Sequence, residues 1–432
     1  MNFFLTRLFR NKYFANSIWT AVEKLARIAY VIFIGSWIAR YLGPSDYGIY
    51  SYVFAVLMIF ILISRLGLPD LLVRFLTPRE ADVEKILASV FTLKLISSLT
   101  LVCLAWFLHI TNVVNSFVAI LSFILLFQIV NPIEQYLIAK VHFKYVAICK
   151  VTQMLIMGCV YAYLIINGQP LISFIYVYLI EELLISLLFL LSIRTLNIHQ
   201  NKINFAYGYD LFKRGLPLLL SGFFVVILMR TDQIMIHYLL NAEAVGVYAA
   251  ASRVAEAFYF IPALFMTALT PSLINAFNTN KKTFQFRYAV FFQILFLASI
   301  FLVPILYYLS PWLVSLLYGS AYKESVQIIQ IYMLVLCPVF INALNMQWFI
   351  CHGHTKTITL ITFIGCVTNI ILNGLMIPRL GLQGAAIATV ICQITPWAFL
   401  LLLSHGRENL KLLFLAFLDV LNIKKIFKLL SE

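Results

Sequence analysis

Long apolar runs dominate the chain, separated by short polar turns such as LGPSDYG at 42–48 and PRLGLQG at 378–384. A bilayer core about 30 Å thick is crossed by roughly 20 apolar residues in a helix. Twelve runs reach this length, and turn chemistry marks their ends. The predicted spans cover residues 16–40, 47–68, 87–109, 117–138, 146–166, 171–193, 216–240, 246–275, 288–309, 326–350, 358–377 and 383–404. The pattern predicts an all-α integral membrane protein.

The basic residues gather on one side of these spans. Lys and Arg number 22 in the loops on the side that holds both termini, whereas only Lys323 and Arg379 lie in the opposite loops. Cytoplasmic loops of membrane proteins are enriched in Lys and Arg. The asymmetry therefore predicts an even number of spans with both termini in the cytoplasm.

Composition supports the same class. The chain is 63% hydrophobic and 11% charged, with a formal net charge of +14, whereas soluble domains are about 25% charged. A soluble protein of this composition would expose large apolar patches. The cytoplasmic loops account for the basic excess, so we predict no nucleic-acid partner.

Two stretches share one pattern, IARYLGPSDYGIYSYV at 38–53 and MIHYLLNAEAVGVYAAAS at 235–252. Each is a helix end, a short polar turn and then Gly-aliphatic-Tyr opening the next helix. Aligning them places the first span over the seventh, which predicts two six-helix bundles related by a parallel pseudo-repeat. The alternative is that two ordinary hairpins look alike. The repeat predicts an N-terminal bundle at 1–193, a cytoplasmic linker at 194–214, a C-terminal bundle at 215–404 and a cytoplasmic or interfacial tail at 405–432.

Thirteen Lys, Arg, Asp and Glu residues are assigned to the interior of the predicted spans, and Lys150, near the start of the 146–166 span, is counted with the loop before it. A charge at the centre of a membrane helix costs roughly 2.5–3.5 kcal/mol on insertion scales, so these side chains are expected to face protein or a watery cavity. Arg40, Arg65 and Lys94 are expected to snorkel to the interface instead. The full set is Lys24, Arg27, Arg40, Arg65, Lys94, Arg230, Arg253, Glu23, Glu134, Glu181, Glu182, Asp232 and Glu256.

The first span carries a continuous polar stripe. Asn16, Thr20, Glu23 and Arg27 stand at i, i+4, i+7 and i+11, on one helical face. Glu23 precedes Arg27 by four residues, the favourable order for an ion pair. These four residues are candidates for lining a central substrate cavity.

The seventh span carries a shorter stripe of Arg230, Gln233 and His237, again on one face. Asp232 points about 200° away from Arg230 on the helix, so it needs a partner on a neighbouring helix or a proton. We assign the stripe to the cavity and Asp232 to ion coupling or neutralisation. The alternative for both stripes is that they only staple helices together.

Three further charged residues are candidates for ion coupling or neutralisation. Glu134 lies on the fourth predicted span, and Arg253 and Glu256 are i, i+3 neighbours on the eighth. For the Arg253–Glu256 pair, a purely structural role is an equal alternative.

Motifs for other chemistry are missing or weak. CHGH at 351–354 resembles a metal cluster, but its close spacing suits a turn better, and we predict no metal site. The sequence contains no Walker A motif and no Gly-x-Ser-x-Gly. We therefore predict neither an enzyme nor a cofactor.

NSIW at 16–19, LGPSDYGIYSYV at 42–53 and GLQGAAIATVICQ at 381–393 resemble the polysaccharide (O-antigen) flippases. This family belongs to the multidrug/oligosaccharidyl-lipid/polysaccharide exporter superfamily. The resemblance extends over almost the whole chain, although the motifs are loose and mostly structural glycines. It implies a multi-pass protein of the bacterial plasma (inner) membrane with a cationic central cavity. Arg27 and Arg230 are the residues of this sequence whose charge best matches such a cavity.

The implied activity is transfer of undecaprenyl-pyrophosphate-linked oligosaccharide, an O-antigen or related repeat unit, from the cytoplasmic to the outer leaflet. Alternating access coupled to an H⁺ or Na⁺ gradient is implied as the mechanism. Membrane lipids and other polysaccharide-assembly proteins are the implied partners. One alternative is a multidrug extruder of the same superfamily, which would favour an acidic, aromatic cavity. Another is a membrane polysaccharide polymerase or glycosyltransferase, which would need a larger loop with catalytic groups.

Overall fold

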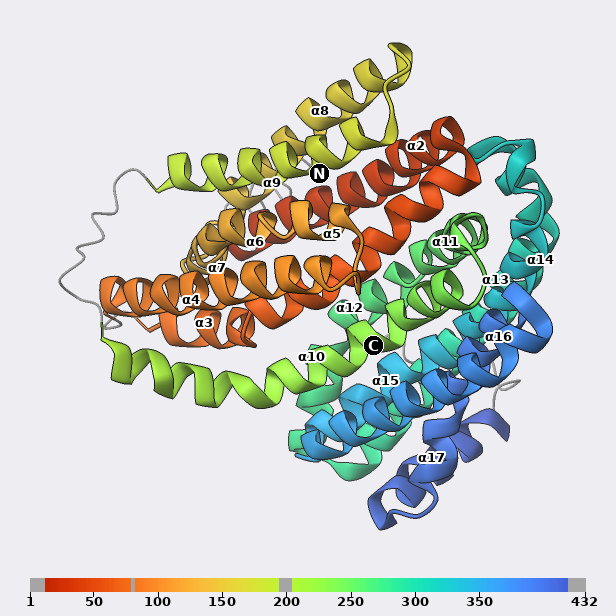
Figure 1. Cartoon of the computed structure of the whole chain (residues 1–432). Helices are drawn as coiled ribbons and strands as arrows, with labels where there is room; N and C mark the ends of the chain where they lie inside the picture. The colour runs from red at the N-terminus through yellow and green to blue at the C-terminus, as the bar shows by residue number, and fades with distance from the viewer. Residues whose placement is uncertain (1–11, 79–81, 194–203, 419–432) are drawn as a thin grey trace, which may run out of the picture. The chain divides into compact units, whose positions relative to one another are not determined.

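The computed structural model describes residues 12–78, 82–193 and 204–418, and these contain helices and no strand (Figure 1). Most of the predicted linker, 194–203, lies outside the described residues. The end of the predicted tail, 419–432, lies outside them too. The described part of the tail is one helix, α17.

The first part of the chain forms helices that follow the predicted spans closely, with the fourth span broken into short pieces. These are α2 (Lys12–Ser64), α3 (Leu68–Leu76), α4 (Val83–Ile110), α5 (Ser116–Leu121), α6 (Ile124–Phe127), η1 (Gln128–Val130), α7 (Pro132–Ala139), α8 (Phe143–Ile166) and α9 (Leu171–Ser192).

The second part has longer helices. These are α10 (Phe205–Leu239), α11 (Ala242–Ala257), α12 (Phe260–Thr279), α13 (Lys281–Leu317), η3 (Ser320–Tyr322), α14 (Ser325–Tyr332), η4 (Met333–Val335), α15 (Leu336–Cys351), α16 (Thr355–Leu400) and α17 (Ser404–Leu418).

Ten stretches of the described residues are long and apolar enough to cross a membrane. Two of them, Ile18–Ser64 with 47 residues and Thr355–Leu400 with 46, are too long for one crossing. Each contains one glycine with positive φ: Gly43 at φ 73° and Gly381 at φ 60°. Residues with a Cβ rarely adopt these angles, so each glycine turns the chain between two spans. Figure 1 draws α2 as two legs joined by this bend. The twelve predicted spans, and with them a multi-pass all-α membrane protein, are confirmed.

The chain divides into two compact units, Met1–Val226 and Ile227–Glu432, with the boundary inside α10. In the first unit α2 packs against α8, and α8 packs against α9. In the second, α11 packs against α14, and α13 packs against both α15 and α17. The pseudo-repeat motif contributes buried side chains to both units, since Tyr50 is 6% exposed and Tyr248 is fully buried.

Apolar side chains fill each unit and also cover its outside. In the first unit, Leu72, Leu87 and Leu211 bring α3, α4 and α10 into one buried cluster. Large apolar residues such as Leu155 and Phe301 remain 68% exposed. Exposed apolar residues over a helical surface suit contact with lipid chains.

Candidate functional site

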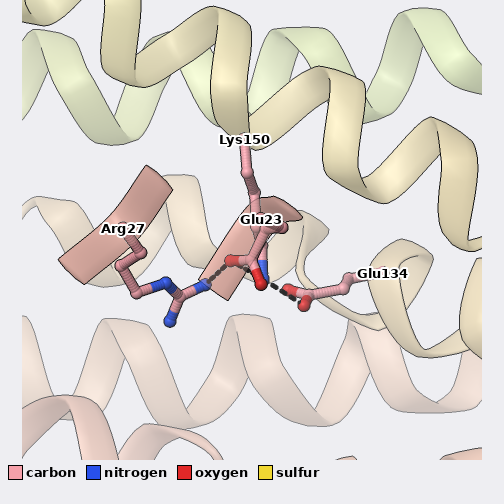
Figure 2. A network of polar contacts seen from close by, with 4 residues as sticks. All are labelled: Glu23, Arg27, Glu134 and Lys150. Atoms are coloured by element: carbon pink, nitrogen blue, oxygen red, sulfur yellow. Dashed lines mark hydrogen bonds and ion pairs between the residues drawn. The ribbon is translucent and has the colours of Figure 1, made fainter. Parts of the chain in front are cut away.

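A network of four charged side chains joins three helices of the first unit (Figure 2). Arg27 on α2 donates to Glu23, one helical turn earlier, and Lys150 on α8 donates to Glu134 on α7. Lys150 Nζ also lies 4.0 Å from the Glu23 carboxylate. Packing of α2 against α8 makes this possible, because it brings the polar stripe of α2 to Lys150. Each acid therefore has a basic partner, while Arg27 keeps half of its side chain exposed.

A pocket of about 220 Å³ opens beside this network. Its ionisable lining is four basic side chains against one acidic one, with Asn131 and Gln135 as neutral hydrogen-bonding groups. The low dielectric of the surrounding protein strengthens the attraction of these bases for an anion. The ionisable lining residues, which we call the basic pocket, are Arg27, Arg65, Lys94, Lys150 and Glu134.

One of these bases corrects the sequence interpretation. Lys94, predicted to snorkel toward the interface, lines the basic pocket from a buried position, whereas Arg65 lines it with an exposed side chain. Lys94 is only 4% exposed and donates to the backbone carbonyl of Gln128 at 2.7 Å. Gln128 begins η1, where the fourth span departs from α-helical geometry, and its carbonyl accepts from the backbone N–H of Asn131 at 3.1 Å as well as from Lys94. A break of this kind explains how a lysine is accommodated in the interior.

Lys150 was missed as a site residue because it was assigned to a cytoplasmic loop. The structure places it two turns inside α8, where its side chain is 16% exposed. A single lysine near the start of an apolar run is also typical of an interface residue, so the sequence carries no signal that separates the two roles.

The beginning of the α2 stripe makes hydrogen bonds to backbone carbonyls. Asn16 Nδ2 donates to the carbonyl of Val141, at the turn between α7 and α8, at 3.0 Å. The hydroxyl of Thr20 donates to the carbonyl of Asn16 at 3.0 Å. Neither side chain lines the basic pocket. In the predicted stripe, Asn16 thus ties α2 to the α7–α8 turn, Thr20 bonds within α2, and the two charged residues belong to the network.

A second buried polar cluster in the first unit surrounds Glu181 on α9. Its carboxylate accepts hydrogen bonds from Gln153 at 2.7 Å, Tyr161 at 3.1 Å and Tyr30 at 3.2 Å. The adjacent Glu182 accepts one from Gln128 at 3.3 Å. Three donors suffice to hold a buried carboxylate, so these in-span acids are accommodated without facing lipid.

In the second unit, Arg230 on α10 faces Glu256 on α11. The two guanidinium nitrogens lie 3.5 and 3.4 Å from the two carboxylate oxygens, a fork arrangement with both side chains partly buried. Glu256 was predicted to pair with Arg253, three residues earlier on the same helix. The structure shows that Glu256 also has a basic partner on another helix, Arg230. Of the other stripe residues, Gln233 is 3% exposed, and His237 is half-buried with its ring edge-on to Tyr238.

The side-chain partner of Asp232 lies on a neighbouring helix. Asp232 is 1% exposed, and its carboxylate accepts from the hydroxyl of Tyr248 on α11 and from the backbone N–H of Gln233 at 2.9 Å. The Tyr248 hydroxyl also lies 3.4 Å from the Thr389 hydroxyl on α16. Asp232 and Arg230 belong to different contacts, as their separation around the helix predicted.

The histidines of CHGH pack against aromatic rings. His352 stacks on Trp348 with centroids 3.9 Å apart, and His354 stacks on His405 at 4.2 Å. Burial and the neighbouring His354 lower the pKa of His405 below its usual value. In the part of the chain that the structure describes, no three His, Cys, Asp or Glu side chains are grouped as metal ligands.

Solved structures define the class of the fold. An inward-facing multidrug resistance MATE transporter of the MOP superfamily matches with TM-score 0.69 and 16% identity, covering 90% of this chain and 95% of that one. The lipid II flippase MurJ in an inward closed conformation matches with TM-score 0.69 and 17% identity, covering 95% and 92%. A MOP superfamily transporter from Pyrococcus furiosus matches with TM-score 0.59 and 14% identity, covering 92% and 95%. The chain thus has the fold of MOP superfamily transporters.

The sequence itself gives the family. Residues 13–277 match the family described as polysaccharide biosynthesis protein, and the chain belongs to that family. Residues 217–375 also match the MatE family. No curated protein matches the sequence significantly.

Proposed function

We propose that this protein is a flippase for undecaprenyl-pyrophosphate-linked oligosaccharide in the bacterial plasma membrane, with both termini in the cytoplasm. The observation that carries the proposal is the basic pocket, whose lining has four basic side chains and one acidic one inside a membrane-spanning unit. Membership of the polysaccharide biosynthesis family supports a sugar-bearing substrate.

The pocket chemistry suits a diphosphate. Arginine guanidinium groups bind phosphate oxygens through paired N–H donors, and lysine adds a compact positive charge. In the resting state Glu23 and Glu134 neutralise Arg27 and Lys150. A bound diphosphate would replace these carboxylates as the anionic partner. The polar head would cross through protein while the polyprenyl chain stays in lipid.

We further propose that transport uses alternating access and an ion gradient. The buried Asp232, held by Tyr248, is the first candidate for taking up H⁺ or Na⁺. Glu134, Arg253 and Glu256 remain candidates for coupling or for neutralising the bases between cycles. Other polysaccharide-assembly proteins are the proposed partners that supply and consume the lipid-linked sugar.

The test is transport of a fluorescent undecaprenyl-pyrophosphate sugar in proteoliposomes. Loss of one guanidinium contact to phosphate is expected to slow transport about tenfold or more, so Arg27→Gln should be impaired. Lys24→Gln is the matched control, since Lys24 is an exposed base on the same helix that does not line the pocket. Equal transport by Arg27→Gln and the control would contradict the assignment of the pocket.

A multidrug extruder is the alternative, favoured by the match to the MatE family. It would export amphipathic cations, which the charge of the basic pocket disfavours. Export of a cationic dye by the same proteoliposomes, without transport of the anionic lipid, would establish this alternative. A polymerase is the weakest reading, because the matching families and folds are those of transporters and flippases.

A further inference from the structure

A second pocket, of about 270 Å³, lies entirely within the second unit, among residues of α12, α13, α15 and α17. It is distinct from the basic pocket and has a different lining, with an aromatic wall and one ion pair. The residues that give it this character are Phe277, Phe284, Trp348, His352, Lys281 and Glu408.

The aromatic wall is built around His352. Its ring stacks on Trp348 at 3.9 Å and meets Phe277 and Phe284 edge-on at 4.8 and 5.5 Å between centroids. His352 Nδ1 lies 2.8 Å from the carbonyl of Trp348, an acceptor, so this nitrogen carries a proton. Trp348 and Phe284 are buried behind the wall, at 1% and 3% exposure, so Phe277 and His352 present its accessible ring surface. Aromatic faces attract an organic ammonium group placed within about 6 Å of the ring centre.

The pocket also contains one charge of each sign. Lys281, the first residue of α13, and Glu408 on α17 form an ion pair at 3.2 Å, with side chains 74% and 47% exposed. An ion pair this exposed contributes little to stability and opens readily. The indole N–H of Trp348, behind the wall, is buried and has no hydrogen-bond partner in the described structure.

We propose that this pocket binds a zwitterion of an amine and a phosphate, the phosphoethanolamine headgroup of a membrane phospholipid. The phosphate would pair with Lys281, and the ammonium would lie between Glu408 and the aromatic wall. When the headgroup separates the ion pair, its phosphate takes the place of Glu408 beside Lys281, and its ammonium takes the place of Lys281 beside Glu408. A simple anion would leave Glu408 unpaired, and a simple cation would leave Lys281 unpaired.

The surroundings of the pocket indicate that the zwitterion belongs to a lipid. Helix α17 buries Leu413 and Ala416 against the bundle, whereas Phe414 and Leu418 remain 62% and 64% exposed. A short helix with exposed apolar residues and nearby bases is typical of one lying in the membrane interface. The pocket also lies at the end of the spans predicted to be cytoplasmic.

The test uses the purified full chain in detergent, titrated with phosphatidylethanolamine or phosphatidylglycerol and followed by native mass spectrometry. We expect a preference of about tenfold for phosphatidylethanolamine, because only this lipid supplies an ammonium to the carboxylate and rings. Glu408→Gln should abolish the preference, and Lys281→Gln should weaken binding of both lipids. A wild type without preference, or a Glu408→Gln variant that keeps it, would overturn the proposal.

Matched controls separate the pocket from general surface charge. Lys282→Gln and Glu243→Gln each remove one exposed charge outside the pocket and should bind as the wild type does. If these controls lost as much lipid binding as the pocket variants, binding would depend on general surface charge and the proposed site would be refuted. Thermal unfolding of all four variants checks that they are folded.

Soluble phosphoethanolamine distinguishes the sources of the headgroup. Competition by this compound would support recognition of the headgroup alone, and binding of only the intact lipid would support a site that also needs acyl chains. Binding of neither ligand would reject the proposal. The inference does not rest on the proposed transport function, since Glu408→Gln should still transport the lipid-linked sugar.

Discussion

Charged side chains inside this membrane protein are held by partners from other helices. Lys150 meets Glu134 and Glu23, and Arg230 meets Glu256, so each of these charges has a partner of opposite sign. Buried pairs are costly to break because one partner is left as an uncompensated charge. Substrate or ion binding that separates such a pair must therefore supply a replacement.

A double-mutant cycle on Lys150 and Glu134 tests this at the residue scale. Lys150→Met should lower the thermal stability of the protein in detergent, since it strands Glu134 in a site where it is 20% exposed. Adding Glu134→Gln should recover much of the loss, giving a coupling energy of about 1–3 kcal/mol. Additive effects of the two substitutions would show that the pair does not interact energetically.

The sequence predicted some of these residues better than others. Helical spacing was enough to place Glu23 with Arg27, since both lie on one helix. It could not reveal that Lys94 meets the Gln128 carbonyl, because that contact depends on a helix break about thirty residues away in the chain. Periodicity shows which face of a helix is polar but not which neighbour that face will meet.

At the scale of elements, turns are made with very few residues. Gly43 and Gly381 each reverse a long helix through one residue with positive φ. The turn stretches containing them were visible in the sequence, which is why span boundaries were predicted well. The broken fourth span, by contrast, was predicted as a single helix, because apolar content alone does not distinguish a continuous helix from α5, α6, η1 and α7.

Close backbone contact between α10 and the α2–α3 turn gives an element-scale prediction. A Cβ on Gly215 would lie 2.4 Å from the carbonyl oxygen of Leu66, a backbone atom with little freedom to move. Gly215→Ala should therefore destabilise the first unit by about 1–3 kcal/mol. Thermal unfolding in detergent measures the change.

Gly208 provides the control on the same helix. A Cβ there would lie 3.4 Å from Cγ of the Leu93 side chain and 3.6 Å from the nearest backbone atom, both close to ordinary contact distances. Gly208→Ala should be neutral or stabilising by up to about 1 kcal/mol, because alanine favours helix more than glycine does. Equal destabilisation by both substitutions would rule out the backbone contact as the cause.

At the scale of the whole molecule, the uneven distribution of Lys and Arg between the two sides predicts the orientation of the spans in the membrane. Lys323 lies next to η3 and Arg379 lies beside the Gly381 turn, and both side chains are exposed. Lys281 and Arg407 are exposed at the opposite predicted side. The four positions form a direct test of topology.

Single cysteines at these positions, in a variant lacking the seven native cysteines, should react differently with a membrane-impermeant maleimide. Lys323→Cys and Arg379→Cys should be labelled in intact cells, and Lys281→Cys and Arg407→Cys only after permeabilisation. Labelling of Arg407→Cys from outside would place the C-terminal helix on the wrong side and contradict the proposed orientation.

Helix α10 runs from Phe205 to Leu239 while the boundary between the two units falls at Val226. An α-helix of 35 residues is about 52 Å long and resists bending except at sites such as Pro217, where a backbone hydrogen bond is lost. The segment at residues 218–239 therefore behaves as one stiff piece of helix. It holds Arg230 and Asp232 at a fixed angle to each other around the helix axis, so neither side chain can turn toward the other's partner without a change in the helix itself.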